Sequence, residues 1–227
     1  MKTRGAFTLI EVMVAVLIFS YMIASLATIY STSQRHFFQN YRSDVIKTGV
    51  VVAMKALQNT LPTATRIDYP ARNARDTVLK FASNVDQLTG CYPINPALPS
   101  TWYLFCLGGD ASTPGYQSLY YYSGNIGGSS AATACGKTAP AIFNPNLYYA
   151  VPNCGGTPGA TKLMQYVVPS SGYIFSRVPS DGAAAPGAVR VSLRSFWQAS
   201  AHSFGRAQHD VDFSMNTLLQ GQVPYTP

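Results

Sequence analysis

The first forty residues contain a long apolar stretch that is interrupted by a single charge. Between Arg4 and Arg35 the only charged residue is Glu11, which is also the only glutamate in the chain. Val12–Tyr30 is uncharged, and with Phe7–Ile10 it is long enough to cross about 30 Å of hydrocarbon as a helix. A carboxylate in such a segment costs about 2.5–3.5 kcal/mol on insertion, so Glu11 is the first candidate for a functional residue.

The composition is that of a loop-rich domain outside the cytosol. The chain has 227 residues, of which 47% are hydrophobic and only 11% charged, and it contains 18 Gly, 15 Pro and 15 Tyr. A typical soluble domain has about a quarter of its residues charged, so a cytosolic enzyme is disfavoured. The net charge of +7 includes Lys2 and Arg4. The rest of the chain is therefore only mildly basic, which leaves nucleic acid or an anionic surface open as a partner.

Four cysteines follow the apolar stretch at wide spacing: Cys91, Cys106, Cys135 and Cys154. They form no CxxC pair, and no histidine lies at zinc-finger spacing from them. An even number of cysteines beyond a membrane segment predicts disulfides in an oxidising compartment. Three pairings satisfy the sequence. We favour Cys91–Cys106 with Cys135–Cys154, because each of these bridges closes a short local loop.

The helical pattern continues well beyond the apolar stretch. No proline occurs between Met1 and Leu61, and Asn59-Thr60-Leu61-Pro62 is a plausible stop. The sequence therefore predicts one helix over 7–60, apolar at first and amphipathic after about Ser33. The expected apolar face of the amphipathic half is Phe37, Tyr41, Val45, Val52 and Leu57.

Three hypotheses account for this N-terminal segment. One is a secretory signal, for which Ser25-Leu26-Ala27 is an acceptable cleavage site and Thr28 the first mature residue. A second is a plain membrane anchor, in which Thr8 and Glu11 form a capping box and Glu11 is merely structural. A secretory signal does not explain why Glu11 lies inside the apolar region or why the helical pattern continues beyond it. A plain anchor explains the length and the orientation but gives Glu11 no function.

The third hypothesis comes from a resemblance carried by the segment Arg4-Gly5-Ala6-Phe7-Thr8-Leu9-Ile10-Glu11-Val12. It closely resembles the processing site of type IV prepilins and of the related pseudopilins of type II secretion. The resemblance implies that residues 1–6 are a leader, which a membrane peptidase removes on the cytoplasmic side before methylating the new amino group of Phe7. The family places a glutamate at the fifth mature residue, and a cut after Ala6 puts Glu11 there. The usual residue before the cut is glycine, and a cut after Gly5 would move Glu11 to the sixth place.

The same resemblance implies the roles of Phe7 and Glu11. In the family, subunits leave the bilayer and pack their apolar helices together in a filament core. A lone carboxylate is costly there unless it is paired, and the amine of Phe7 in a neighbouring subunit is the expected partner of Glu11. Both residues are then expected to act in assembly. The implied partners are other pilin subunits through the N-terminal helix, the prepilin peptidase, and the inner membrane before assembly.

Residues 61–227 are expected to form a β-rich head. Short runs separated by Gly, Pro, Asn and Ser suggest strands at Thr77–Ala82, Thr101–Leu107, Ser118–Tyr122, Leu147–Val151, Leu163–Val168 and Tyr173–Val178. Val189–Arg194 and Asp210–Met215 alternate strictly between apolar and polar residues, as half-buried strands do. The predicted fold class is α+β, with the amphipathic half of the helix packed on an antiparallel sheet.

Signs of catalysis are scarce in the sequence. It contains no GxSxG, Walker or HExxH motif, so we predict no enzyme, no catalytic residue, no cofactor and no metal. Tyr120–Tyr122 and Tyr148-Tyr149, with Arg190, Arg194 and Arg206, leave a DNA-binding or adhesive pilin as an alternative. The preferred function is a minor pilin that helps to start or tip a pilus, and a minor pseudopilin of a type II secretion system is the alternative. The expected location is a single pass of the inner membrane with the N-terminus cytoplasmic and the head periplasmic, and then an extracellular filament.

Overall fold

The protein is described here from a computed structural model. The structure describes residues 8–109, 115–127, 142–151, 153–169, 171–178, 187–198 and 210–222. The chain divides into two compact units, Met1–Asp44 and Val45–Pro227. The second unit contains the sheet and is called the head below.

A single long helix, α1, spans Leu9–Thr60, and a short 3₁₀ turn, η1, follows at Leu61–Thr63. These bounds confirm the predicted helix within about two residues at each end, and Pro62 lies at the predicted stop. Buried side chains begin only at Ile46. They recur three or four residues apart, which is the spacing of one helix face. They are Ile46, Val50, Ala53, Met54 and Leu57.

The expected apolar face of the amphipathic half was only partly right. Leu57 is buried, but Phe37 and Tyr41 are 67% and 60% exposed, and Val45 and Val52 are also exposed. The two exposed aromatic residues precede the head unit, which starts at Val45. Within the head the buried stripe lies on the face of Val50 and Leu57 and not on that of Val52, because a shift of two residues turns a helix by more than half a turn.

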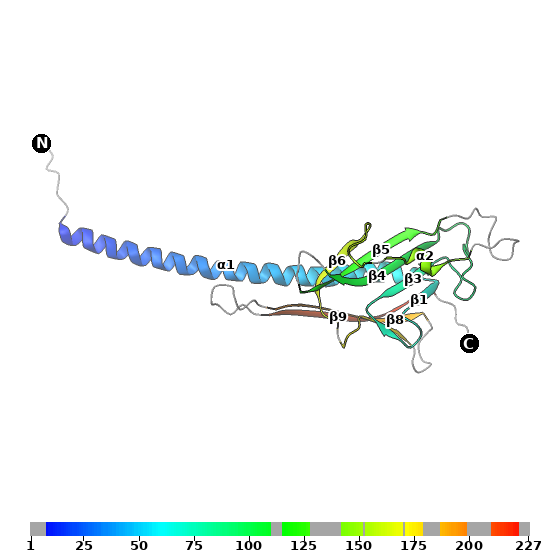
Figure 1. The fold of residues 1–227 in the computed structure, drawn as a ribbon. Helices are drawn as coiled ribbons and strands as arrows, with labels where there is room; N and C mark the ends of the chain where they lie inside the picture. Colours follow the sequence, from blue (N-terminus) through cyan, green and yellow to red (C-terminus); the bar gives the residue numbers. More distant parts are fainter. Residues whose placement is uncertain are drawn as a thin grey trace. The chain divides into compact units, whose positions relative to one another are not determined.

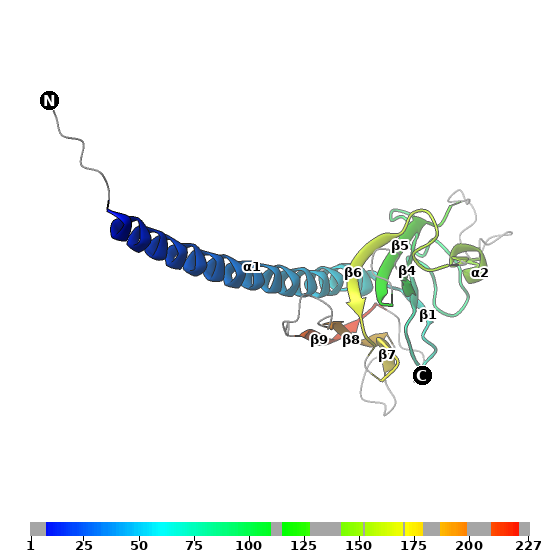
Figure 2. The same ribbon diagram turned by 60° about the vertical axis from the view of Figure 1, so that its left-hand side comes forward.

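The described part of the head contains one antiparallel sheet. Its strands are β1 (Arg66–Tyr69), β2 (Arg75–Asp76), β3 (Leu79–Ser83), β4 (Thr101–Gly109), β5 (Gln117–Asn125), β6 (Thr161–Val167), β7 (Phe175–Val178), β8 (Ala188–Trp197) and β9 (Val211–Gln220). The strand order is β1-β3-β4-β5-β6-β8-β7-β2, and β9 pairs with β8. Figure 1 shows these strands gathered around the last turns of α1, and Figure 2 shows the curvature of β6 as it crosses that end of the helix. The predicted α+β class is confirmed.

One core lies between the sheet and the end of α1. Val50, Met54 and Leu57 pack there against buried residues from seven of the strands, among them Phe81, Phe105 and Leu193. Phe81 and Phe105 are completely buried, and their rings stack with centroids 6.1 Å apart. The amphipathic end of the helix therefore covers one face of the sheet, as the alternating strands predict.

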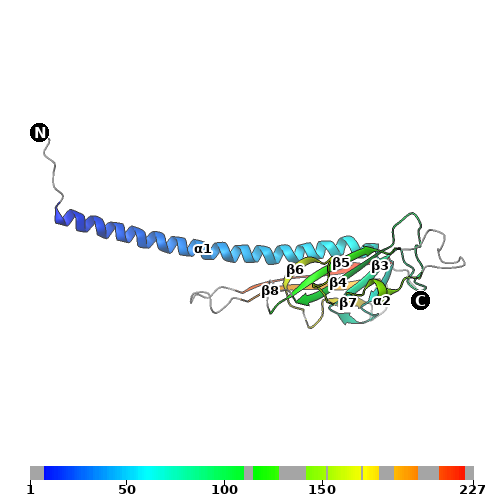
Figure 3. The ribbon, with the colours of Figure 1, turned by 45° about the horizontal axis from the view of Figure 1, so that its top comes forward.

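A second apolar layer covers the other face of β3, β4 and β5. Its buried side chains are Ala82, Val85, Tyr92, Leu104, Cys106, Tyr120, Tyr122, Ile126, Phe143 and Tyr149. Part of the cover is the short helix α2 (Pro145–Tyr148), which lies by the end of β3 in Figure 3. The predicted strand over Leu147–Val151 was wrong. Asn144 caps α2 by accepting a hydrogen bond from the Asn146 N–H, and Pro145 fits the first helical turn.

The other strand predictions agree with the structure within a few residues. β8 and β9 are longer than predicted, because they pair continuously from Ala188↔Gln220 to Trp197↔Val211. Two strands were not predicted, β1 and the two-residue β2. Arg66 and Ile67 precede the first predicted strand, and both pair with β3. Polar neighbours on both sides of Ile67 conceal its strand character in the sequence.

Candidate functional site

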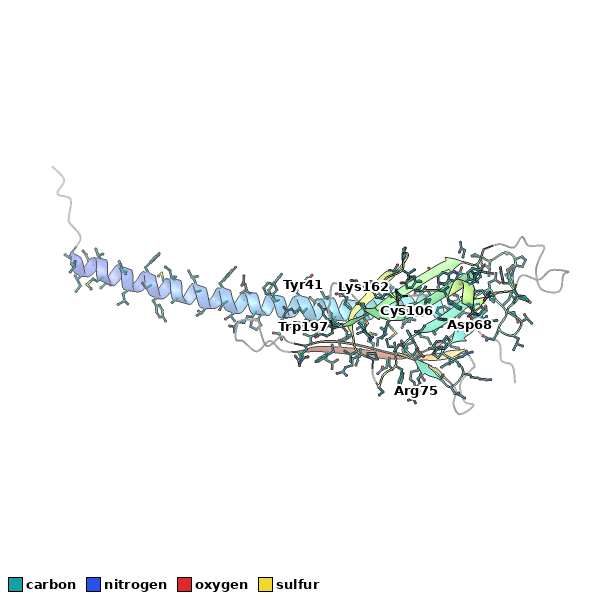
Figure 4. All side chains as sticks on the ribbon, viewed as in Figure 1. Tyr41, Asp68, Arg75, Cys106, Lys162 and Trp197 are labelled. Carbon is teal, nitrogen blue, oxygen red and sulfur yellow. A yellow bond between two sulfur atoms is a disulfide. The ribbon has the colours of Figure 1, made fainter. Side chains whose placement is uncertain are left out.

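The first half of α1 presents apolar side chains all around its surface. None of the side chains from Leu9 to Asp44 is buried. Leu9, Leu17 and Tyr21 are 82%, 71% and 77% exposed, respectively. The helix is long and apolar enough to span a membrane by length and composition. Figure 4 shows side chains projecting singly along this part of α1, whereas those of the head crowd together around Cys106 and Asp68. A surface of this kind is stable only against lipid or other apolar helices.

Glu11 lies in the first turn of this helix and forms a capping box with Thr8. Its Oε2 accepts a hydrogen bond from the Thr8 N–H at 3.0 Å and another from the Thr8 hydroxyl at 3.1 Å. In return the Glu11 N–H points to the Thr8 hydroxyl oxygen at 3.4 Å and to the Thr8 carbonyl oxygen at 3.1 Å. The geometry is therefore the one expected for a structural helix cap.

The capping box uses only one of the two oxygens of the Glu11 carboxylate. Both bonds from Thr8 go to Oε2, and the side chain is exposed. Among the described residues, no group donates a hydrogen bond to Oε1. A carboxylate offers about four acceptor positions, so a further hydrogen-bond donor, or a cation, can bind Oε1 without breaking the cap. The cap therefore does not exclude the assembly role predicted for Glu11, because it uses only Oε2.

The predicted cleavage residues Gly5, Ala6 and Phe7 lie outside the described residues. Their processing, and the predicted pairing of Glu11 with the amine of Phe7, remain predictions. The Thr8 N–H that binds Glu11 would persist after a cut on either side of Ala6, because Thr8 would still follow another residue. The cap is therefore compatible with both cleavage positions.

The favoured disulfide pairing was wrong, since Cys106 is bonded to Cys154 with 6.1 Å between their Cα atoms. Cys106 lies in the middle of β4, and its side chain belongs to the layer on the face opposite α1. Cys154 lies in the segment that covers this face. Strand alternation and layer position decided the pairing here, and closeness in sequence did not. Cys91 is also disulfide-bonded, and Cys135 lies outside the described residues.

Beside the disulfide, the backbone of β4 packs closely against the Cys154 segment. A Cβ at Gly108 would lie 2.0 Å from the carbonyl oxygen of Cys154, whereas a Cβ at Gly109 would meet nothing within 4 Å. Only glycine lets β4 approach the Cys154 segment this closely. The disulfide and Gly108 together fix the cover of the second layer to the sheet.

The tyrosines that suggested a DNA-binding surface do not gather on one surface. Tyr120 and Tyr122 are buried in the second layer, while Tyr121 points to the other face and contacts Phe105, with ring centroids 4.9 Å apart. Tyr149 is buried, and its hydroxyl donates to Asp68 at 3.0 Å. Burial and the Asp68 charge raise the pKa of Tyr149 far above its ordinary value.

The basic residues of that surface are only partly available. Arg194 forms a two-pronged ion pair with Asp212, with distances of 3.0 and 2.6 Å, and Arg206 lies outside the described residues. Only Arg190 of the three is seen exposed. In the described ranges, no group of three His, Cys, Asp or Glu side chains could hold a metal ion. The strongest candidate site is therefore the start of α1 with its apolar surface.

Comparison with known proteins also identifies the N-terminal segment as the part of the chain that resembles a known family. Residues 1–27 match the family described as the prokaryotic N-terminal methylation motif. This motif is characteristic of type IV prepilins and pseudopilins, so the resemblance seen in the sequence is confirmed, and a pilin- or pseudopilin-like protein is supported. That family is structural and not enzymatic. Neither the curated proteins nor the solved structures give a match to the chain.

Proposed function

We propose that this chain is a minor type IV pilin, a structural subunit that a prepilin peptidase processes and that helps to start or tip a pilus. The observation that carries the proposal is the combination of two features. The methylation motif occupies residues 1–27, and the helix that follows it has no buried side chain before Ile46. A pseudopilin would share both features, and the genes beside this one distinguish a pilus system from a secretion system.

The physical logic of assembly starts from the exposed apolar half of α1. In the membrane, lipid covers this surface. In a filament, the apolar helices of neighbouring subunits replace the lipid, so little apolar area returns to water during the transfer. Burial alone does not fix how far one helix slides along another, and a polar pair within the apolar region does fix it.

Glu11 is suited to supply that pair. Its Oε2 is held by Thr8, which restrains the side chain, while Oε1 accepts no hydrogen bond from the described residues. We assign the open oxygen to the amine of Phe7 on the adjacent subunit, after a cut between Ala6 and Phe7. In a medium of low dielectric constant such a pair specifies register more than it adds stability.

The proposed location follows from charge and redox chemistry. Lys2 and Arg4 precede the apolar segment, and the positive-inside rule keeps them in the cytoplasm. The head would then lie in the periplasm before it joins the extracellular filament. The Cys106–Cys154 disulfide supports this location, because disulfides persist in oxidising compartments.

The test compares three variants in cells that make the pilus. Glu11→Gln keeps an oxygen for the cap but loses the charge, Glu11→Val loses both, and Thr8→Ala loses the capping hydroxyl but keeps the charge. We expect both Glu11 variants to be cut and inserted normally. Their incorporation into sheared filaments should fall about tenfold, which corresponds to 1.4 kcal/mol. Thr8→Ala should assemble nearly normally. The proposal would be refuted by normal incorporation of Glu11→Gln, or by equal losses in Thr8→Ala and Glu11→Val.

A further inference from the structure

A disulfide holds one loop of the head across its second apolar layer. The loop comprises residues 153–160, between α2 and β6, and is called the strap below. Its Cys154 is bonded to Cys106 in the middle of β4. Other contacts fix the residues on either side of the strap, because Tyr149 is buried in the second layer and Thr161 begins β6, where it pairs with β5. The bond therefore acts on a loop whose flanking residues have their own places in the fold.

The strap lies directly on two tyrosines of the second layer. The N–H of Gly155 donates to the Tyr122 hydroxyl at 2.9 Å. A Cβ at Gly155 would run into the ring of Tyr120, and a Cβ at Gly108 would run into the carbonyl group of Cys154. The two glycines thus let the strap approach the sheet without a side chain in between. In this closed position Tyr120 and Tyr122 are 6% and 3% exposed, respectively.

The strap itself buries little apolar surface. All of its residues are described, and none has a buried side chain. Cys154 and Ala160 pack against the second layer as partly buried residues, while Gly155, Gly156 and Gly159 have no side chain to contribute. Fixing a loop costs conformational entropy at each residue, and apolar burial is the main effect that offsets this cost. The disulfide therefore supplies most of what keeps the strap closed.

The main core, between the sheet and α1, makes no use of the strap. No residue of this fully described loop is among the buried or partly buried members of that core. On β4 the neighbours of Cys106, which are Phe105 and Leu107, pack into the main core, whereas Cys106 belongs to the second layer. Successive residues of a strand point to opposite faces, so the strap and the main core lie on opposite faces of β4. The strap can therefore leave its face of the sheet without disturbing the main core.

We propose that the Cys106–Cys154 disulfide is a redox latch. In the reduced chain the main core is folded and the strap is open, which exposes the edges of Tyr120 and Tyr122. In the oxidised chain the strap is closed and covers them. The head thus folds in two separable steps, and only the second step depends on the redox environment. In the proposed location the second step follows export from the cytoplasm, and this timing rests on the proposed function.

Closing the latch is a thiol–disulfide exchange with an oxidant that carries a disulfide. The thiolate of Cys154, on the open strap, attacks one sulfur of the oxidant, forms a mixed disulfide and releases the first oxidant thiol. The thiolate of Cys106 then attacks the Cys154 sulfur, forms the protein disulfide and releases the second oxidant thiol. The two cysteines lose two electrons and two protons in total, and the oxidant gains them.

The first test opens the latch by substitution, in the full chain in detergent. A reductant is unsuitable here, because Cys91 is also disulfide-bonded. The double variant Cys106→Ala, Cys154→Ala removes only the latch. Hydrogen exchange should become about tenfold faster, or more, at the Gly155 amide, whose bond to Tyr122 depends on the closed strap. Exchange at the amides of β3 and β8, which line the main core, should not change.

A matched pair of glycine variants tests the same coupling from the strap. Gly155 and Gly159 have positive φ values of +85° and +90°, so alanine strains the backbone similarly at the two positions. At Gly155 the new Cβ also meets Tyr120, whereas at Gly159 it meets nothing within 4 Å. In glutathione buffers, the equilibrium constant for forming the Cys106–Cys154 bond should be about tenfold lower in Gly155→Ala than in Gly159→Ala. Thiol alkylation followed by mass spectrometry of the two cysteine peptides measures it.

Three results would overturn the latch. Unchanged exchange at the Gly155 amide in the double variant would mean that the strap stays closed without the bond. Equally faster exchange in β3 and β8 would mean that the bond supports the whole head. Equal equilibrium constants for Gly155→Ala and Gly159→Ala would mean that closing of the strap and formation of the bond are not coupled. None of these results bears on the cut before Phe7 or on Glu11, so failure here is distinct from failure of the proposed function.

Discussion

The two halves of α1 differ in where their apolar side chains find cover. From Leu9 to Asp44 no side chain is buried, although this part is the more hydrophobic. From Val45 to Thr60 the helix buries one stripe, including Val50 and Leu57, against its own sheet. The second half therefore finds its cover within the head, whereas the described part of the chain supplies no cover for the first half.

The difference shows how the sequence separates folding from assembly. A helix that is apolar on one side needs one partner, and the chain supplies it as a sheet. A helix that is apolar on all sides needs lipid or several other helices. Each large apolar side chain gains about 1.5–3 kcal/mol on full burial, so the first half has a strong drive to associate. Substitutions in the two halves should accordingly affect different properties.

The largest expected effect is a change in the free energy of unfolding that follows a substitution in one half of α1 and not in the other. Leu57→Ala removes a completely buried side chain from the main core and should lower the free energy of unfolding of the head by about 3 kcal/mol. Leu17→Ala, the same chemical change at a residue that is 71% exposed, should leave it unchanged. Denaturant unfolding in detergent, followed by the fluorescence of Trp102 and Trp197, measures both. Equal destabilisation by the two variants would contradict the comparison.

A second pair of variants tests whether the head packs on its own. Gly108→Ala forces a Cβ against the Cys154 carbonyl oxygen and should cost about 2 kcal/mol of unfolding free energy. Gly109→Ala adds a Cβ in open space and should change stability by well under 1 kcal/mol. Neither change should alter membrane insertion. Indistinguishable unfolding midpoints for the two variants would mean that β4 does not approach Cys154 as described.

The smallest effect is a pH dependence confined to the head. Hydrogen bonds from the Thr89 hydroxyl and N–H, at 2.7 Å each, lower the pKa of Asp86. A lowered folded pKa means that Asp86 contributes stability above its unfolded pKa, near 4, and that this contribution is lost as the pH falls through the folded pKa. The difference in melting temperature between the wild type and Asp86→Asn should therefore shrink below about pH 4. A difference that stays constant from pH 7 to pH 3 would refute this role.

Sequence reasoning succeeded where one periodicity persists over many residues. The length of α1, the strict alternation of β8 and β9, and the α+β class all follow from such patterns. It failed where a short segment carries conflicting signals. Leu147–Val151 has the composition of a strand, but Asn144 and Pro145 before it begin a helix. The local capping preference prevailed over strand propensity there.

The sequence indicated the residues of the candidate site, but it did not indicate the long-range contacts elsewhere in the protein. The capping box of Thr8 and Glu11 was considered only within the hypothesis of a plain membrane anchor, which was not the preferred one, and the structure contains that pair. The Cys106–Cys154 bridge was missed because it depends on which layer covers β4, a long-range property. The structural role of Asn84 in the head was missed for a similar reason. Its buried side chain binds the backbone of Asn95 and Leu98, and a single polar residue in a sequence does not reveal such a partner.

The measurement that tests the central claim most directly is the mass of the mature N-terminus. The chain is produced with a prepilin peptidase, purified from the membrane and analysed by mass spectrometry of its N-terminal peptide. The account predicts a chain that begins at Phe7 and carries one methyl group on its amine. A chain that begins at Thr28 would contradict it, because the apolar half of α1 would then be a discarded secretory signal.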